Sequence, residues 1–317
     1  MNPLETAEIG HTNLLVTRLG FGGAPLGGLF TSVGDTNTQD TVLAAYDTGL
    51  RYFDTAPFYG HGTGETRLGS VLRHYPRDDY TLSTKVGRVL VRPDSGDIQD
   101  HQYKDVLPLN PEFDFSADGI RRSFESSLER LGLDRIDIAL IHDPDDHYEQ
   151  ALCEAFPALA RMREEGIVSA IGAGMNQWEM LYDFAREADF DCFLLAGRYT
   201  LLDQSAQEKL LPACENRGIA IILGGPYNSG ILAGGEHYNY ETAPPEIIAR
   251  KNKLDTLCAE HDVPLKAAAL QFPLRHPAIA CVVAGARTAS EVRENFEMMA
   301  HTIPRRFWDA LTEELHA

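Results

Sequence analysis

The stretch SADGIRRSFESSLERLGLDRIDIALIH, residues 116–142, contains the two patterns on which the fold prediction depends. In its first half, apolar side chains recur at positions 120, 124, 128 and 131, a helical spacing that requires one buried face. Ser116 can cap this helix and Gly132 ends it. Residues 136–142 then form a short apolar run, rich in β-branched side chains, that is typical of a buried strand. The stretch therefore predicts a helix that leads directly into a buried strand.

The same alternation of short apolar runs and longer helical patterns extends along the chain, which is typical of a parallel sheet with crossover helices. It predicts eight strands, at residues 19–23, 51–55, 80–85, 136–142, 168–172, 192–195, 220–223 and 280–283. Helices are predicted at residues 38–48, 65–73, 117–131, 148–165, 178–187 and 205–217. A doubly wound dinucleotide-binding sheet would require GxGxxG after its first strand, but residues 20–25 read GFGGAP. We therefore predict a single α/β domain, residues 1–317, folded as a (β/α)8 TIM barrel.

Three further segments surround the predicted barrel. Residues 8–19 have the pattern of a hairpin with its turn at 10–13, which we expect to plug the bottom of the barrel. Long loops, rich in Gly, Pro and Asp, follow the third strand (residues 87–115) and the seventh strand (residues 224–245). Barrel enzymes build their active sites from loops at the carboxyl ends of strands, so these two loops are expected to shape the site.

Charge and composition exclude several kinds of partner. The 317 residues include 47 Asp and Glu against 28 Lys and Arg, a formal charge of −19 that repels phosphate backbones and anionic membranes. The amino-terminal residues lack a signal-peptide pattern, and no run approaches the roughly 18 apolar residues of a membrane span. The sequence therefore predicts a cytoplasmic monomer or small homo-oligomer that binds small molecules, with no nucleic-acid or membrane partner.

Cysteine and histidine spacing gives no indication of a metal site. The five cysteines include no CxxC pair, and the His- and Asp-rich run at residues 142–147 lacks the HxH spacing of barrel metallohydrolases. We therefore expect core thiols and no metal.

Three polar residues, Asp54, Lys85 and His142, end three successive predicted strands. In a barrel the carboxyl ends of strands converge on one mouth, and Tyr59, in the loop after Asp54, can fold back into it. Each residue alone is more often a rim or packing residue. However, Lys85 is unfavourable to bury without a counter-charge, which Asp54 can supply. The four side chains are therefore expected to share one pocket.

These four residue types suit proton transfer. An ammonium beside a phenol stabilises the phenolate and lowers the Tyr pKa from about 10, so we predict that Lys85 lowers the pKa of Tyr59. Tyr59 would then carry the proton, and His142 would hydrogen-bond the reacting oxygen. The chain shows no Ser-His-Asp nucleophile, and it lacks the paired acids of a glycosidase.

The segments around these residues resemble the aldo-keto reductase family. RYFDTAPFYGHGTGETRLG, residues 51–69, is similar to the family's DTAxxYG..E..LG segment, while STKVG at 83–87 and LIHDPD at 140–145 are similar to its Lys and His strands. The resemblance covers about residues 19–295. It implies a catalytic set of Asp54, Tyr59, Lys85 and His142, and hydride transfer between a nicotinamide cofactor and a small substrate.

The same resemblance implies a cofactor site. Asn176 is expected to bind the carboxamide, and Glu294 and Asn295 match an adenine-contacting pair. Gly224 stands where the family's nicotinamide-stacking Tyr is expected, with Tyr227 as a substitute. The implied cofactor-binding residues are Gly22, Gly23, Asp54, Asn176, Gly224, Gly225, Gly230, Leu232, Gly285, Arg287, Glu291, Glu294 and Asn295.

Two departures from the family pattern bear on NAD against NADP. Gly285 stands where many members have a phosphate-binding Lys, and Glu291 stands where many have an Arg. A carboxylate at 291 would repel a 2′-phosphate and could accept hydrogen bonds from ribose hydroxyls. Arg287 remains a candidate phosphate ligand. The sequence therefore predicts NAD, with NADP as the alternative.

The segments GFGGAPLGGLF (20–30), LLAGRYTLLDQ (194–204) and GGPYNSGIL (224–232) resemble the family's aldose 1-dehydrogenase branch, which includes L-fucose, L-galactose and D-threo-aldose dehydrogenases and pyridoxal 4-dehydrogenases. This implies oxidation of an anomeric hydroxyl to a lactone, with substrate contacts from Tyr59, His142, His61 and Tyr227. The alternatives are a pyridoxal 4-dehydrogenase, an NADP-dependent aldehyde or ketone reductase, and a cofactor-binding regulatory subunit without catalysis.

Overall fold

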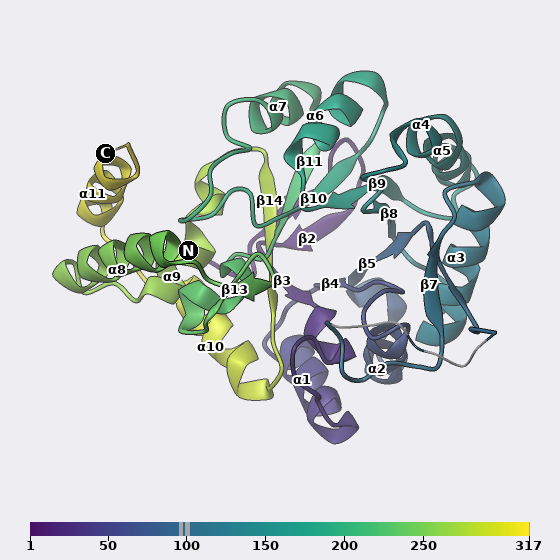
Figure 1. Cartoon of the computed structure of the whole chain (residues 1–317), viewed down its shortest axis with the longest axis horizontal. Coiled ribbons are helices and arrows are strands. Elements are labelled where there is room, and N and C mark those ends of the chain that lie inside the picture. Colours follow the sequence, from purple (N-terminus) through teal and green to yellow (C-terminus); the bar gives the residue numbers. More distant parts are fainter. Residues whose placement is uncertain (95–97, 99–101, 317) are drawn as a thin grey trace.

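The computed structural model describes residues 1–94, 98 and 102–316. Eight parallel strands close into a barrel, with helices arranged around it (Figure 1). In barrel order from the first along the chain, the strands are β3 (Leu19–Gly22), β4 (Tyr52–Asp54), β5 (Thr81–Val86), β8 (Ile138–His142), β9 (Ala170–Met175), β10 (Cys192–Ala196), β11 (Ala220–Gly224) and β14 (Ile279–Gly285). Each predicted strand is present within a few residues of its expected bounds, and the (β/α)8 barrel is confirmed.

The helices follow the strands in the order expected of βα units. They are α1 (Asp35–Asp47), α2 (Thr63–Leu72), α3 (Ala117–Leu131), α4 (Tyr148–Gln150), α5 (Phe156–Glu164), α6 (Trp178–Glu187), α7 (Leu210–Arg217), α8 (Pro245–Glu260), α9 (Leu265–Gln271), α10 (Ala289–Ala300) and α11 (Arg305–His316). The Ser116 hydroxyl caps α3 by accepting from the Gly119 amide at 3.1 Å, and Gly132 ends it at φ 63°. Two helix predictions need correction: α7 begins later than residue 205, and a π-helical turn, Ala151–Ala155, interrupts the 148–165 helix.

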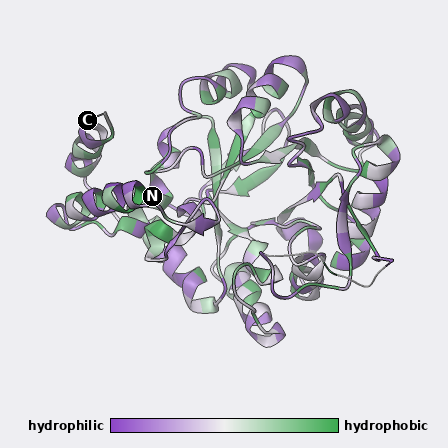
Figure 2. Cartoon of the chain, viewed as in Figure 1, coloured by the Kyte–Doolittle hydropathy of each residue, from purple (hydrophilic) through white to green (hydrophobic). Residues whose placement is uncertain are grey.

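The amino-terminal hairpin closes one end of the barrel. Strands β1 (Thr6–Glu8) and β2 (Leu15–Thr17) pair antiparallel, and the fully buried side chains of Ile9 and Val16 pack with barrel-interior residues such as Tyr52 and Ile138. Figure 2 shows hydrophobic colour concentrated on the strands and hydrophilic colour on the outer faces of the helices. Burial of an Ile or Val side chain contributes about 1.5–3 kcal/mol, so the hairpin is held firmly in place. The predicted plug is confirmed.

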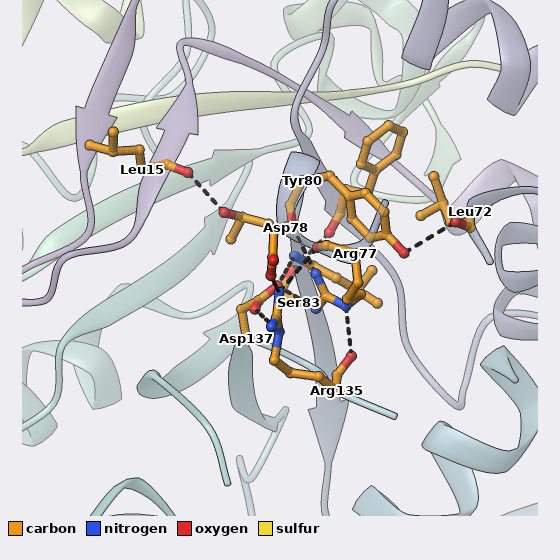
Figure 3. Close-up of polar contacts among 11 residues, drawn as sticks. Leu15, Leu72, Arg77, Asp78, Tyr80, Ser83, Arg135 and Asp137 are labelled. Atoms are coloured by element: carbon orange, nitrogen blue, oxygen red, sulfur yellow. Dashed lines mark hydrogen bonds and ion pairs between the residues drawn. The ribbon is translucent and has the colours of Figure 1, made fainter. Parts of the chain in front are cut away.

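A buried carboxylate fixes β5 against β8 at their amino-terminal ends. Asp137 accepts a hydrogen bond from the Leu82 amide at 2.7 Å and forms ion pairs with Arg77 (2.5 Å) and Arg135 (3.2 Å). Figure 3 shows both guanidinium groups directed at this carboxylate. The contacts support the parallel register in which Lys85 lies opposite Leu140. The strand register fixed at this end of the barrel therefore determines which residues of β5 and β8 lie at their carboxyl ends.

The two long loops contain short hairpins of their own. After β5, β6 (Arg88–Val91) pairs with β7 (Asn110–Phe113). After β11, the 3-10 helix η4 (Asn228–Ala233) precedes a hairpin of β12 (His237–Tyr238) and β13 (Glu241–Thr242). Both loops follow carboxyl ends of strands and both contribute to the cavities described below. Within the described ranges, the helices all fall short of the length and apolar character that a membrane crossing requires.

Candidate active site

Lys85 is the centre of the polar cluster at the barrel mouth. Its ammonium lies 2.8 and 3.0 Å from the two carboxylate oxygens of Asp54, and it donates to the Thr55 carbonyl at 3.0 Å and the Tyr59 hydroxyl at 2.9 Å. The Lys85 side chain is almost fully buried. An ammonium at such a position requires a counter-charge and filled donors, and it has both. The expected Asp54–Lys85 ion pair is therefore present.

Tyr59 reaches this cluster from the loop after β4. A Cβ at Gly27 would lie 2.5 Å from the Tyr59 carbonyl carbon, so a glycine there is what allows the loop to pack against the mouth. The Tyr59 and His142 rings meet edge to face, with centroids 6.2 Å apart. The structure thus brings all four predicted catalytic residues together.

The electrostatics of Tyr59 differ from the prediction. Burial, followed by the negative charge of Asp54, raises the Tyr59 pKa well above its usual value of 10. The prediction that the Tyr59 pKa lies below 10 is wrong for the protein alone, because desolvation of the phenolate and the Asp54 charge outweigh the stabilisation that the Lys85 ammonium gives. Tyr59 is therefore a protonated phenol, held by a hydrogen bond from an ammonium.

His142 is a neutral imidazole. Burial, with the nearby charges of Arg88 and Lys85, lowers its pKa well below 6.5. Its Nε2 lies 3.4 Å from the Asp143 carboxylate, and its Nδ1 has no hydrogen-bond partner among the described residues. A neutral imidazole can donate one hydrogen bond to a substrate oxygen without adding charge to the site.

Two adjoining cavities open at the mouth. One, of about 440 Å³, extends to the amino-terminal end of α10, and the other, of about 580 Å³, contains Lys85 and His142. Their shared walls are Tyr59, Tyr103, Leu194, Ala196 and Tyr240. We refer to them as the first and second cavities. Tyr59 therefore stands where the two cavities meet, within reach of a molecule bound in either one.

Most of the predicted cofactor residues line the first cavity. These are Gly22, Asp54, Gly224, Gly225, Gly230, Gly285, Arg287, Glu291, Glu294 and Asn295. Asn176 instead lines the second cavity, while Gly23 and Leu232 line neither. The Gly23 amide donates to the Asp54 carbonyl at 2.8 Å, a structural contact.

The other two predicted substrate residues, Tyr227 and His61, do not line the second cavity. Tyr227 lines the first cavity, where its hydroxyl donates to the Asn295 amide oxygen at 2.8 Å, so it belongs with the expected cofactor residues. His61 lines neither cavity. The His61 ring is fully buried, and its Nδ1 lies 2.6 Å from the Leu109 carbonyl oxygen. His61 is therefore removed from the expected substrate contacts.

The charged residues near the start of α10 are paired with one another, which the sequence did not reveal. Glu291 accepts a hydrogen bond from the Arg287 amide at 2.7 Å and lies 3.3 Å from its guanidinium. Lys266, from α9, also lines the first cavity and pairs with Glu294 at 2.7 Å. Both described cations that line this cavity thus have a carboxylate beside them.

Tyr240 was also missed by sequence reasoning. Asn239 and Tyr240 form the two-residue turn between β12 and β13, with φ values of 49° and 68°, a left-handed conformation that is rare for an aromatic residue. The Tyr240 hydroxyl donates to the Asn176 amide oxygen at 3.3 Å, and its side chain borders both cavities. Residue type alone gives no sign of this placement.

The first cavity suits a dinucleotide. Six of its lining residues are glycines, at 22, 224, 225, 230, 235 and 285, which leave backbone accessible to a ligand. The amino terminus of α10 adds a helix dipole that favours anionic groups. The residues present therefore fit a nicotinamide dinucleotide.

The fold and site agree with comparisons to known proteins. The model of the aldo/keto reductase family matches residues 18–315, and the chain belongs to this family. The chain is 43% identical to D-threo-aldose 1-dehydrogenase of Pseudomonas sp over 311 aligned positions, covering 95% of this chain and 94% of that protein. It is 41% identical to pyridoxal 4-dehydrogenase of Microbacterium luteolum over 333 positions, covering 98% and 97%.

Solved structures show the same fold. An aldo-keto reductase from Bacillus halodurans matches with a TM-score of 0.76 and 24% identity, covering 98% of this chain and 96% of that one. A glycerol dehydrogenase from Gluconobacter oxydans matches with a TM-score of 0.77 and 22% identity, covering 98% and 94%. With the family established by sequence, the chain is an NAD(P)-dependent oxidoreductase that acts on a small molecule.

Proposed function

We propose that the chain oxidises the anomeric hydroxyl of an aldose, of the L-fucose, L-galactose or D-threo-aldose type, to the lactone, with NAD as hydride acceptor. The observation that carries this proposal is the position of the Tyr59 hydroxyl. It lies 2.9 Å from Lys85, at the junction of a glycine-lined cavity and a polar cavity. The 43% identity to D-threo-aldose 1-dehydrogenase supports the choice of substrate class.

The residues of the chain divide the chemistry between them. The sugar loses a hydride from C1, which NAD would accept when bound. Tyr59 first releases its own proton to solvent, and the resulting phenolate then takes the proton of the anomeric hydroxyl. Lys85 stabilises that phenolate by its hydrogen bond, and Asp54 fixes the ammonium in place. The neutral His142 donates a hydrogen bond to the reacting oxygen and orients it. The C1–O bond becomes the carbonyl of the lactone.

NAD is favoured over NADP by the charge balance of the first cavity. The Lys and Arg residues that line it within the described part of the chain, Lys266 and Arg287, pair with Glu294 and Glu291. Both of these cations are therefore already paired with a carboxylate, which weakens any attraction for a 2′-phosphate. Glu291 would also repel that phosphate, a form of selection against the wrong cofactor.

The second candidate is oxidation of pyridoxal, favoured by the 41% identity to pyridoxal 4-dehydrogenase. NADP-dependent aldehyde or ketone reduction is the remaining alternative and would require Arg287 to bind the phosphate. A cytoplasmic location, and an oligomeric state of monomer or small homo-oligomer, remain predictions from the sequence.

A substrate panel tests the proposal. The purified protein is incubated with L-fucose, L-galactose, a D-threo-aldose and pyridoxal, each with NAD and with NADP, while absorbance of the reduced nicotinamide is followed. We expect the highest kcat/KM with an aldose and NAD. Turnover of pyridoxal alone would select the second candidate, and turnover only with NADP would overturn the cofactor assignment.

Glu291→Arg is expected to raise kcat/KM for NADP by about one to two decades, since it replaces a repulsive carboxylate with a phosphate ligand. The KM of the sugar should not change. Steady-state kinetics with both cofactors measure the effect, and Glu297→Arg, on an exposed face of the same helix, is the matched control. The NAD assignment would be contradicted if Glu291→Arg left kcat/KM for NADP unchanged while Arg287→Ala lowered kcat/KM for NADP far more than for NAD.

A further inference from the structure

Asp143 is held in an unusual backbone conformation beside the tetrad. It follows His142 directly and has φ 43°, a left-handed value that Asp tolerates better than most residues but still at some energetic cost. Its amide donates to the Gly174 carbonyl at 3.0 Å, which fixes the peptide against β9. Its side chain lines the second cavity. The backbone is therefore fixed so that a carboxylate stands next to the proposed reaction centre.

Arg88 is fixed in position against this carboxylate. Gly87 turns the chain back at φ 93°, where a Cβ would lie 2.3 Å from the Phe115 ring. The Arg88 guanidinium then lies over the rings of Phe58 (4.3 Å) and Phe113 (4.7 Å), and Nη2 donates to Asp143 Oδ2 at 2.7 Å. Its Nε is buried without a hydrogen-bond partner in the described ranges. Two aromatic faces and one ion pair thus hold the Arg88 guanidinium in place at the wall of the second cavity.

Positive and negative charges are balanced among the described residues at the second cavity. Lys85 pairs with Asp54, Arg88 pairs with Asp143, and burial keeps His142 neutral. The ion pair and the His142 contact at Asp143 both use Oδ2, so Oδ1 adds an acceptor. The described residues of the cavity therefore offer hydrogen-bond donors and acceptors but no unpaired charge.

We propose that Arg88 and Asp143 determine substrate specificity, binding hydroxyl groups of a neutral sugar and rejecting anionic sugars. A hydroxyl both donates and accepts, so adjacent ring hydroxyls can pair with a carboxylate and a guanidinium at once. The carboxylate or phosphate group of a charged sugar would lie beside Asp143 and find Arg88 already neutralised. This inference rests on the proposed aldose oxidation and names which aldoses it accepts.

Asp143→Asn tests the inference because it removes the charge while keeping the shape. With NAD, KM for the best neutral aldose is expected to rise roughly tenfold, and kcat/KM for the matching uronic acid to rise roughly tenfold, because Arg88 becomes unpaired. Arg88→Lys keeps the charge pair but loses the planar fork. It should raise KM for the neutral aldose without any gain for the uronic acid. Asp146→Asn, exposed in the same loop, is the control.

The outcomes separate the two proposals. Fluorescence titration should give an unchanged Kd for NAD in both variants, which also shows that they are folded. If the wild type oxidises no aldose, the proposed function fails and this inference fails with it. If the wild type oxidises aldoses but Asp143→Asn leaves the neutral-to-acidic preference unchanged, the inference alone is overturned. Arg88→Lys that matches the wild type in KM would overturn the role of Arg88.

Discussion

Tyr59→Phe is expected to lower kcat by roughly 10²–10⁴-fold while the Kd for NAD stays within a few-fold. The substitution removes the hydroxyl that hydrogen-bonds Lys85 and carries the proton, but leaves the ring that borders both cavities. Steady-state assays give kcat, and fluorescence titration gives cofactor affinity. A variant that retains more than about a tenth of wild-type activity would remove Tyr59 from this role.

The pH dependence adds a second readout for Tyr59. Its pKa is raised well above 10, so below that value the phenolate fraction increases about tenfold per pH unit. The kcat of the wild type for oxidation should therefore rise with pH through the neutral and mildly alkaline range, and the residual rate of Tyr59→Phe should lack this rise. Tyr75→Phe, which makes the same chemical change far from the mouth, should behave like the wild type.

Lys85→Met is expected to lower kcat by roughly a thousandfold or more and to destabilise the fold. Without the ammonium, the Asp54 carboxylate stays buried and, among the described residues, keeps only the Ser83 hydroxyl as a side-chain donor, at 2.7 Å. Removal of one partner of a buried ion pair destabilises by about 3–5 kcal/mol, which a urea titration would detect. A fully active Lys85→Met enzyme would contradict the role of Lys85.

A double variant separates the two effects of Lys85. In Lys85→Met with Asp54→Asn, the buried charge is absent, so part of the lost stability should return. Activity should not return, because nothing then stabilises the Tyr59 phenolate. A double variant as unstable as Lys85→Met would mean that packing, rather than the unpaired carboxylate, is responsible.

The strands and the four catalytic candidates could be predicted because both depend on local pattern. Buried parallel strands are short apolar runs, and the polar residue that ends such a run must lie at the mouth of the barrel. Lys85 and His142 were found in this way, and both lie in the second cavity. Helices α8 and α9 were not predicted, and with them Lys266 was missed as a residue of the first cavity.

The errors and omissions concern where side chains point and how deeply they are buried, neither of which residue type encodes. His61 was expected to contact substrate, but its ring is buried in the loop. Tyr240 and Asp143 reach the cavities only because their backbones are left-handed, a conformation that neither residue type requires. The Tyr59 pKa was given the wrong direction because the cost of desolvating a phenolate outweighs an ammonium that is already paired.

The hairpin that seals one end of the barrel has a kinetic consequence. With Ile9 and Val16 filling that end, both reactants must arrive and depart through the opposite rim, where the two cavities share Tyr59 and Tyr240. Hydride transfer without a covalent carrier on the enzyme requires sugar and dinucleotide to be resident together. Initial-rate patterns should therefore be sequential rather than double-displacement. Because both products leave through the same entrance, the time that one product stays there limits how soon the second product can be replaced by a new reactant.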